Sequence, residues 1–292
     1  MPAEPPEETG DLYLLEQRFR YTYSNPVLRL QHRLVVVPRA VYGGQYRLGY
    51  GVTVSGALAD VTETSDSFGN HVMELNAPTV AEWIEFEAWS LVGHRWPPGG
   101  VTNLPNAAVG DDRLLSFTRL TRPDGAMADA ARDLSASSSG DLDLAERICT
   151  WSYESMTYEN GVTGVHTTAA TALAGGKGVC QDYAHVMLAL CRQAGLPARY
   201  VSGHLTGEGG SHAWVEVVVP DPGNQIAARR VAVAFDPTHE CRAGQGYFTI
   251  AVGRDYADVA PTSGAFEGRS PGALTSRKWL GLADPSLRPA AS

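Results

Sequence analysis

The stretch GGKGVCQDYAHVMLALC, residues 175–191, places a cysteine directly after a glycine-rich turn and directly before an apolar pattern of helical period. From Cys180 onward, apolar side chains recur every three or four residues as far as Cys191, which predicts a helix with one buried face. Gly195 and Pro197 then end the predicted helix. A thiol in the first turn of a helix lies beside unpaired backbone N–H groups and the positive end of the helix dipole, which favour its ionised, nucleophilic form. The same position also suits a small buried side chain, so position alone leaves Cys180 as either a nucleophile or a core residue.

Composition and charge describe a globular chain of one large or two ordinary domains. It has 292 residues, 43% of them hydrophobic, and a formal net charge of -9. The acidic balance, with no run of Lys or Arg, argues against nucleic acid as a partner. Residues 1–10, MPAEPPEETG, are acidic and proline-rich, which predicts a disordered N-terminus rather than a signal peptide, and no later stretch approaches membrane-spanning length. We therefore expect a cytoplasmic protein that does not contact a membrane, and the sequence leaves its oligomeric state open.

The four cysteines lack the spacing of a disulfide framework or of a zinc site. They are Cys149, Cys180, Cys191 and Cys241. We expect all four to be reduced thiols.

The order of patterns along the chain predicts an α+β protein in two parts. Residues 11–105 are short β-rich segments separated by the turn signals SNP, YGG and DSFGN, which predicts an N-terminal antiparallel β domain. In residues 106–270, helical patterns come first, with LDLAERICTWSYESM the clearest, and the strand-like segments ARYVSGHL, SHAWVEVVV and VAVAFDPT follow the Cys180 helix. We expect this second part to be the catalytic domain, a helix packed on an antiparallel sheet, with residues 271–292 as a C-terminal extension.

A histidine and an aspartate stand at the ends of two neighbouring predicted strands. His212 opens SHAWVEVVVP, and Asp236 ends VAVAFD just before a proline that closes the strand. A hairpin register centred on Asn224 would place His212 directly opposite Asp236 on one face. A carboxylate beside an imidazole fixes its tautomer and stabilises its protonated form, so a neighbouring thiol can lose its proton and attack a carbonyl carbon. Taken singly, His212 also fits a satisfied strand-end histidine and Asp236 a turn residue.

Four segments in this part resemble, in order, the bacterial transglutaminase-like superfamily of papain-type cysteine enzymes. They are GKGVCQDYAHVMLALCRQAGLPARYVSGHL, SHAWVEVVVP, AFDPTHE and AVGRDYADVAPTSGAF, between about Thr168 and Gly268. In the first part, YTYSNPV, VVVPR and DSFGNHV are similar to the N-terminal β-region that commonly precedes this core. The resemblance implies a papain-like α+β core and a Cys-His-Asp triad carried by Cys180, His212 and Asp236.

The chain departs from the family pattern in two places. The segment before the aspartate strand lacks an aromatic Gly-Trp element, and DPTHE replaces a more usual asparagine after the threonine. Both departures touch the rim of the cleft, so they bear on substrate shape more than on chemistry.

Residues near the proposed nucleophile have simpler explanations. The backbone N–H of Cys180 or of Gln181 could donate to an oxyanion, and the sequence identifies no second donor. Asp182 fits an ordinary first-turn residue favoured by the helix dipole. Cys191 falls on the buried face and should be inert.

Three further histidines of this part are candidates for the cleft or for a metal site. His185 fits a solvated or core histidine, and His204 and His239 could line the cleft but fit solvent-facing loop residues better. A metal centre built from Cys180 and His212 with His204 or His185 matches no zinc spacing.

The sequence thus predicts acyl transfer at a peptide or carboxamide carbonyl through a thioester. Cys180 attacks, His212 takes and returns the proton, and Asp236 orients the imidazole. We expect a peptide or protein substrate and no cofactor or metal, and the acidic segments contain no D-x-D-x-D-G calcium loop. The expected cleft residues, which include Trp214 and Glu216, are polar or amphipathic and favour hydrolysis, as in a cysteine protease or amidase. The alternatives are a true transglutaminase with an amine acceptor and a non-catalytic peptide-binding module.

Overall fold

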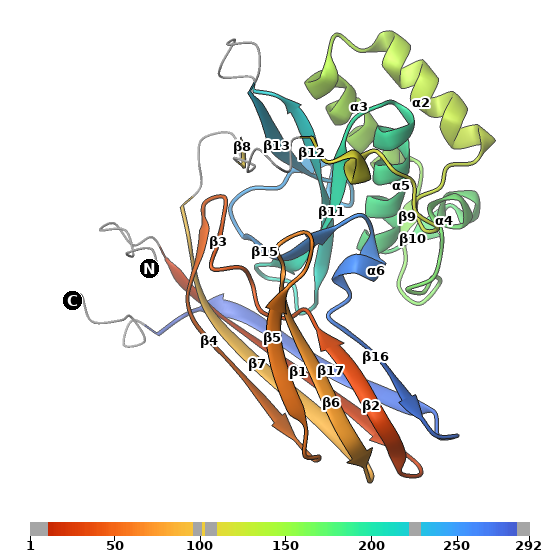
Figure 1. The fold of residues 1–292 in the computed structure, drawn as a ribbon. Helices are drawn as coiled ribbons and strands as arrows, with labels where there is room; N and C mark the ends of the chain where they lie inside the picture. Colours follow the sequence, from red (N-terminus) through yellow and green to blue (C-terminus); the bar gives the residue numbers. More distant parts are fainter. Residues whose placement is uncertain (1–10, 96–100, 103–109, 222–228, 285–292) are drawn as a thin grey trace.

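The computed structural model describes residues 11–95, 101–102, 110–221 and 229–284 (Figure 1). It shows antiparallel sheets from the first part of the chain beside a helical core packed on a further sheet, which confirms the predicted α+β class. The predicted disordered segment, residues 1–10, lies outside the described residues.

Two antiparallel sheets form a sandwich in the lower half of Figure 1. Their strand orders are β17-β1-β7-β4-β3 and β16-β2-β6-β5. The strands of the first part are β1 (Leu12–Tyr23), β2 (Val27–Leu34), β3 (Val41–Tyr42), β4 (Gln45–Ser55), β5 (Asp60–Ser65), β6 (His71–Val80) and β7 (Trp83–His94). Alternate residues of these strands point inward, and Phe19, Leu30, Leu75 and Phe86 form the buried layer between the sheets.

The last two strands of the chain complete this sandwich. β16 (Thr262–Glu267) pairs with β2, and β17 (Gly272–Leu282) pairs with β1 along its whole length. The first of these strands lies in the range predicted for the catalytic domain and the second in the range predicted for a C-terminal extension. Both ends of the described chain therefore meet in the same two sheets.

The second part is a sheet of six strands with helices against one face. Its strands run in the order β14-β13-β12-β11-β15, with β8 also paired to β13. Their bounds are β8 (Val101–Thr102), β11 (Ala198–Leu205), β12 (His212–Pro220), β13 (Arg230–Asp236), β14 (Cys241–Arg242) and β15 (Tyr247–Gly253). The helices are η2 (Asp112–Leu114), α2 (Gly125–Ser137), α3 (Asp141–Glu154), α4 (Ala169–Gly175), α5 (Cys180–Gln193) and α6 (Tyr256–Val259), and the short strands β9 (Thr157–Tyr158) and β10 (Lys177–Gly178) pair in parallel.

Helix α5 is the central element of this second part. All residues from Asp182 to Arg192 are buried, because the sheet covers one side of α5 while α2, α3 and α4 pack on the others (Figure 1). The prediction of a single buried face therefore underestimated how much of the helix is buried. Its end is as predicted: Gly195 has a φ of +80°, and the N–H groups of Gly195 and Leu196 donate back to Arg192 and Cys191 carbonyls at 3.1 and 2.8 Å.

Buried polar contacts join the sandwich to the second sheet at the edge strand β15. The side-chain amide of Gln45 donates to the Thr249 carbonyl at 2.8 Å and accepts from the Thr249 N–H at 2.8 Å. Asn70 makes the equivalent pair of bonds with Val252, at 2.7 and 2.9 Å. These amides satisfy backbone groups that an edge strand would otherwise leave unpaired, so they fix the sandwich against the second sheet.

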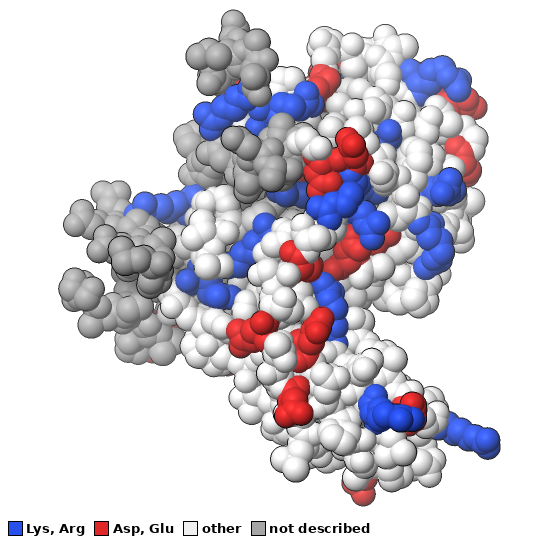
Figure 2. All heavy atoms as spheres, viewed as in Figure 1, with Lys and Arg blue, Asp and Glu red and all other residues white. Residues whose placement is uncertain are grey.

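On the face seen in Figure 2, acidic and basic side chains are interspersed. Among the described residues, no helix has both the length and the apolar character needed to cross a membrane.

Candidate active site

The first turn of α5 holds Cys180 in a fixed position. Residue Val179 is extended, with φ −113° and ψ 177°, and its N–H donates to the carboxylate of Asp182 at 2.8 Å. The hydroxyl of Thr163 donates to the same carboxylate oxygen at 2.6 Å. A Cβ on Gly178 would lie 2.7 Å from the Asp182 side chain, so the glycine leaves room for this cap. Asp182 is thus the helix-capping residue that its first-turn position predicted, and Cys180 is left half-buried at the helix start.

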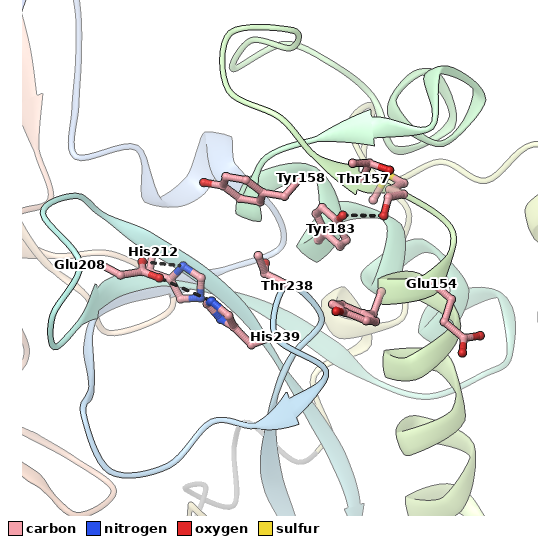
Figure 3. Close-up of a pocket in the computed structure, with 10 residues that line it drawn as sticks. Glu154, Thr157, Tyr158, Tyr183, Glu208, His212, Thr238 and His239 are labelled. Atoms are coloured by element: carbon pink, nitrogen blue, oxygen red, sulfur yellow. Dashed lines mark hydrogen bonds and ion pairs between the residues drawn. The ribbon is translucent and has the colours of Figure 1, made fainter.

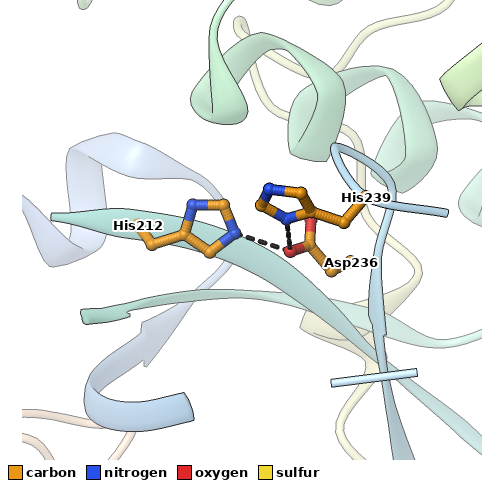
Figure 4. Close-up of side chains that lie close together, drawn as sticks. All are labelled: His212, Asp236 and His239. Carbon is orange, nitrogen blue, oxygen red and sulfur yellow. Dashed lines mark hydrogen bonds and ion pairs between the residues drawn. The ribbon is translucent and has the colours of Figure 1, made fainter. Parts of the chain in front are cut away.

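The hairpin that carries the other two predicted residues has a different register from the predicted one. Val215 pairs with Phe235 and Pro220 with Arg230, so continuing the ladder places Asp236 opposite Trp214 rather than opposite His212. The predicted register was therefore wrong by two residues. A shift of two keeps every side chain on its original face, so His212 and Asp236 remain diagonal neighbours. Their side chains meet across the strands, with His212 Nε2 2.7 Å from Asp236 Oδ2 (Figure 4).

Asp236 is fully buried and accepts hydrogen bonds at both carboxylate oxygens. Its Oδ2 atom accepts from His212 Nε2, from His239 Nδ1 at 2.6 Å and from the Tyr247 hydroxyl at 2.8 Å, and Oδ1 accepts from the Thr238 N–H at 2.8 Å. Burial alone would raise the pKa of this carboxyl group. The hydrogen bonds, that of His212 first, outweigh burial and lower the pKa of Asp236 to about 2. The group is therefore a carboxylate throughout the physiological range.

His212 is buried and charged. Burial opposes the imidazolium, but hydrogen bonds to Asp236 and to Cys180, together with the charges of both partners, raise the pKa of His212 to about 10. Because Nε2 faces Asp236, Nδ1 is the atom left for the thiol. The carboxylate of Glu208 also lies near it, with Oε2 3.4 Å from Nδ1. The arrangement pairs a protonated imidazole with the side chain of Cys180.

A pocket of about 600 Å³ opens beside His212 (Figure 3). It is lined by side chains from the end of α3, from β9, from α5 and from the segments at the ends of β12 and β13. They are Tyr153, Glu154, Met156, Thr157, Tyr158, Tyr183, Glu208, His212, Thr238 and His239. Three are tyrosines, two are glutamates, and none is a lysine or an arginine. The pocket beside His212 is therefore aromatic and acidic.

The structure separates the three remaining predicted histidines. His185 is buried in the core, where Nε2 accepts from the Tyr256 N–H at 3.2 Å and burial lowers its pKa to about 3, so it is a core histidine. His204 is also buried, and its Nδ1 lies 3.1 Å from the Gly210 carbonyl, so the expectation of a solvent-facing residue was wrong. His239 lies in the site, bonded to Asp236 and lining the pocket.

Trp214 and Glu216, expected in the cleft, are both buried, although the Trp214 ring stacks beside His212 with 6.2 Å between the ring centroids. They share the His212 face of β12, but farther along the strand that face is covered by the sandwich. Glu216 accepts from Arg199 Nε at 2.8 Å and from the Tyr42 hydroxyl at 2.6 Å, all three being buried. The expectation that these two side chains line the cleft is therefore corrected.

The other cysteines differ from Cys180 in their surroundings. All four are free thiols, and Cys149 and Cys191 are buried. Burial raises the pKa of Cys149, and it raises the pKa of Cys191 to about 12. Cys241 is exposed, 3.5 Å from the Tyr247 hydroxyl, and partial burial of its sulfur raises its pKa as well.

One group of side chains in the site has the geometry of metal ligands. The ligand atoms of His212, Asp236 and His239 lie within 4.8 Å of one another. The hydrogen bonds among these three, with that of Tyr247, already account for Asp236 without an ion. The metal hypothesis required His204 or His185, and neither belongs to this group.

Three residues of the site carry no motif in the sequence. Tyr247 reaches Asp236 from β15, Glu208 reaches His212 from the turn before β12, and Lys278 reaches toward Cys180 from β17. Burial lowers the pKa of Lys278 to about 8, while the charge of Cys180 acts in the opposite direction. Only the folded chain brings these three groups into the site.

Comparison with known proteins finds related sequences over both parts of the chain. The profile of the transglutaminase-like superfamily matches residues 128–226, and that of the bacterial transglutaminase-like N-terminal region matches residues 13–93. The chain is 30% identical over 281 residues to uncharacterized protein Rv2569c of Mycobacterium tuberculosis, covering 86% of each chain. It is 39% identical over 129 residues to uncharacterized protein ML0607 of Mycobacterium leprae, which is 41% of this chain and less than half, 43%, of that relative.

A solved structure shares the whole fold. A protein from Cytophaga hutchinsonii, described as a proposed cysteine protease, superposes with a TM-score of 0.74 at 21% identity, over 97% of this chain and 94% of that one. Together the two profiles and the full-length relative cover the sandwich and the helical core. The chain therefore belongs to the transglutaminase-like superfamily and carries the bacterial N-terminal region of that family.

Proposed function

We propose that this protein is a cysteine enzyme that acts on a peptide or carboxamide carbonyl through a Cys180-His212-Asp236 triad. The observation that carries the proposal is the position of His212, bonded through Nε2 to a buried carboxylate at 2.7 Å and hydrogen-bonded on its other side to Cys180. A thiol, a protonated imidazole and a carboxylate in line are the parts of a thioester-forming enzyme.

The proposed reaction has two stages. The sulfur of Cys180 attacks the carbonyl carbon, and the first-turn N–H groups of Cys180 or Gln181, which have no acceptor within the helix, stabilise the oxyanion. The C–N bond then breaks, and the imidazolium of His212 gives its proton to the leaving amine. In the second stage the incoming acceptor attacks the thioester carbon, and neutral His212 takes a proton from it. The C–S bond then breaks, Cys180 leaves as the thiolate, and His212 is again protonated as at the start.

We propose water as the main acceptor, which makes the protein a hydrolase of peptide or isopeptide-like amides. The pocket beside His212 carries hydroxyl, carboxylate and imidazole groups, which hold water at the position from which the thioester is attacked. The cytoplasmic location expected from the sequence remains a prediction.

Transfer to an amine is the second candidate, and one feature favours it. The same pocket places Glu154 and Glu208 beside the rings of Tyr153, Tyr158 and Tyr183. Carboxylates and aromatic faces attract an ammonium group, so a cationic amine would be concentrated next to the thioester. The acceptor then depends on whether the amine reaches the pocket in its neutral form before water attacks.

The test is to trap the acyl-enzyme on a library of peptides in acid quench and to identify the fragment attached to Cys180 by mass spectrometry. With a peptide so identified, hydrolysis is compared with incorporation of a labelled primary amine, and Cys180→Ala serves as the control. The proposal predicts a thioester on Cys180 alone and faster hydrolysis than incorporation.

Each other outcome has a definite meaning. Incorporation that outruns hydrolysis at modest amine concentration would make the protein a transglutaminase in activity. If the wild type forms no thioester yet binds peptides as tightly as Cys180→Ala does, the protein is a non-catalytic binding module and the proposed chemistry is wrong.

A further inference from the structure

The outer face of the sheet β17-β1-β7-β4 presents two half-exposed tryptophans in one row. Trp279 pairs with Glu16, and Glu16 pairs on its other side with Trp89, so the three side chains lie side by side on β17, β1 and β7. The next row on the same face is Arg277, Arg18 and Glu87. We call these six residues the tryptophan platform.

Both indoles lie flat because glycines form their floor. Trp89 crosses the neighbouring strand β4, where a Cβ on Gly51 would lie 2.5 Å from its Nε1 and a Cβ on Gly49 would lie 3.4 Å from its far ring. Trp279 folds over its own strand, where a Cβ on Gly281 would lie 2.4 Å from its Cζ2. One face of each indole ring therefore packs on the backbone, and the other face points outward.

The platform combines these flat rings with free polar groups. Trp89 and Trp279 are 46% and 49% exposed, and they border a depression of about 520 Å³ that Glu16, Arg18, Glu87 and others line. Arg18 forms an ion pair with Glu85 at 2.7 Å and lies 3.5 Å from Glu87. Within the described part of the chain neither Glu16 nor Arg277 forms an ion pair, so both keep hydrogen-bonding capacity for a ligand.

Neither ring belongs to the core of the sandwich. Its core lies on the other side of the sheet, where Phe19 and Phe86 are buried, and large apolar rings left open to water mark binding surfaces. A Trp that only had to fill space would be packed, as Trp214 is.

We propose that the tryptophan platform binds an extended polysaccharide, with pyranose rings stacked on Trp89 and Trp279. The C–H face of a pyranose matches a flat indole, and its hydroxyls need both donors and acceptors, which Arg277 and Glu16 supply. The Trp279 ring lies over β17 and the Trp89 ring over β4, so a ligand that stacks on both must extend across the sheet and be longer than one ring. The platform holds two acidic and two basic residues, so it lacks the net charge that would select a polyanion or an anionic membrane.

Lys278 lies between Arg277 and Trp279 in the sequence and points to the opposite face of β17, where its Nζ is 5.5 Å from the centre of the Phe19 ring. The binding proposal does not depend on the catalytic one.

The experiment is co-sedimentation of the full chain with insoluble chitin, cellulose and de-peptidated glycan from bacterial cell walls. Trp89→Ala/Trp279→Ala should weaken binding about tenfold or more, because both stacking surfaces are lost. Gly51→Ala keeps both rings but pushes Trp89 off its floor, so it should weaken binding as well. Trp83→Ala is the matched control, because Arg20 already covers that ring at 3.8 Å, and it should bind normally.

Circular dichroism and thermal unfolding of each variant separate loss of binding from loss of fold. The proposal is overturned if none of the three polysaccharides retains the wild type, or if the double variant binds as well as the wild type. Retention on phospholipid vesicles or on proline-rich peptides alone would assign the platform to another class of partner and would equally overturn it.

Discussion

At the scale of single residues, the site depends on one carboxylate that accepts four hydrogen bonds. Asp236 is buried, and three of its four bonds come from side chains, one of which belongs to His212. The pKa values of the two partners move apart, to about 2 for Asp236 and about 10 for His212, so the pair is charged across a wide range of pH. The charged imidazole is what the structure offers the thiol of Cys180.

Asp236→Asn should therefore move the alkaline limb of the pH–kcat/KM profile. Without the carboxylate the pKa of His212 falls, and the limb should shift to lower pH by about one to two units. Below the limb kcat/KM should also fall roughly a hundredfold, because an amide can hold the imidazole in the wrong tautomer and does not stabilise its charge. Tyr247→Phe, which removes a hydrogen bond to Asp236 but no charge, should leave the limb within about one unit of wild type.

The same variant has a predicted effect on stability with a definite pH window. The low pKa of Asp236 stabilises the fold above its unfolded value of about 3.9, and this is lost as pH falls through about 2. The high pKa of His212 stabilises the fold fully below about 6.5, and this is lost as pH rises through about 10. The difference in unfolding free energy between wild type and variant should peak between about pH 4 and 6.5. A difference that does not vary with pH would show that the pair does not titrate as described.

The sequence indicated the three central residues because each stands at an element boundary with its own signal. It did not indicate Tyr247 or Glu208, because their contacts to Asp236 and His212 form only when β15 and the turn before β12 come together. The burial of His204 was missed for a related reason: nothing in the local pattern shows that a strand end will be covered.

At the scale of elements, the periodicity of the sequence predicts the type of element better than it predicts how two strands pair. The helical period of α5 and the alternation of β12 predicted a helix and a strand, and both elements form, but almost every residue of each is buried, so the burial itself is not periodic. The hairpin register was wrong by two residues, because such a shift leaves the same side chains on the same face and the hydrophobic pattern cannot detect it. His212 and Asp236 lie on the same face of the sheet in both the predicted and the observed register. Sharing that face is what brings the two side chains together.

The capped start of α5 gives the prediction at this scale. Asp182→Ala removes the acceptor for the Val179 N–H, which should cost about 0.5–2 kcal/mol of stability, and should lower kcat/KM by displacing Cys180. Asp182→Asn keeps an acceptor oxygen and should recover most of both losses. Thr163→Val, which removes only the second donor to the carboxylate, is the control for the cap itself. Chemical denaturation and steady-state kinetics measure the effects, and unchanged activity in Asp182→Ala would show that the cap does not position the thiol.

At the scale of the whole molecule, the sandwich and the catalytic sheet are built as one body. Leu15, Val35 and Val72 of the sandwich belong to the same buried cluster as α5. The strands β16 and β17 then return the chain to the sheets in which it began. The sequence could not show this, because residues more than 200 positions apart in the chain pair in these sheets. The arrangement also explains why Trp214 and Glu216, which share a face with His212, are covered rather than open to substrate.

The buried cluster of Tyr42, Arg199 and Glu216 gives the prediction at this scale, because it joins the sandwich to the catalytic sheet. The Arg199 and Glu216 side chains are only 5% and 3% exposed, and the Tyr42 hydroxyl bonds to both. Glu216→Gln leaves a buried guanidinium without its counter-charge and should destabilise the protein by about 3–5 kcal/mol. Tyr42→Phe removes one hydroxyl but leaves the Arg199–Glu216 ion pair intact, so it should lower the free energy of unfolding by about 1 kcal/mol.

Glu63→Gln is the matched control for that change, because Glu63 also accepts from a tyrosine hydroxyl, that of Tyr50 at 2.7 Å, but at the exposed edge of the sandwich. Its effect should stay below about 0.5 kcal/mol. Urea denaturation followed by tryptophan fluorescence and by circular dichroism gives all three values. Since the cluster belongs to both parts, Glu216→Gln should lower the midpoint seen by both probes together. If only one probe shifts, the two parts unfold separately and the cluster does not join them into one body.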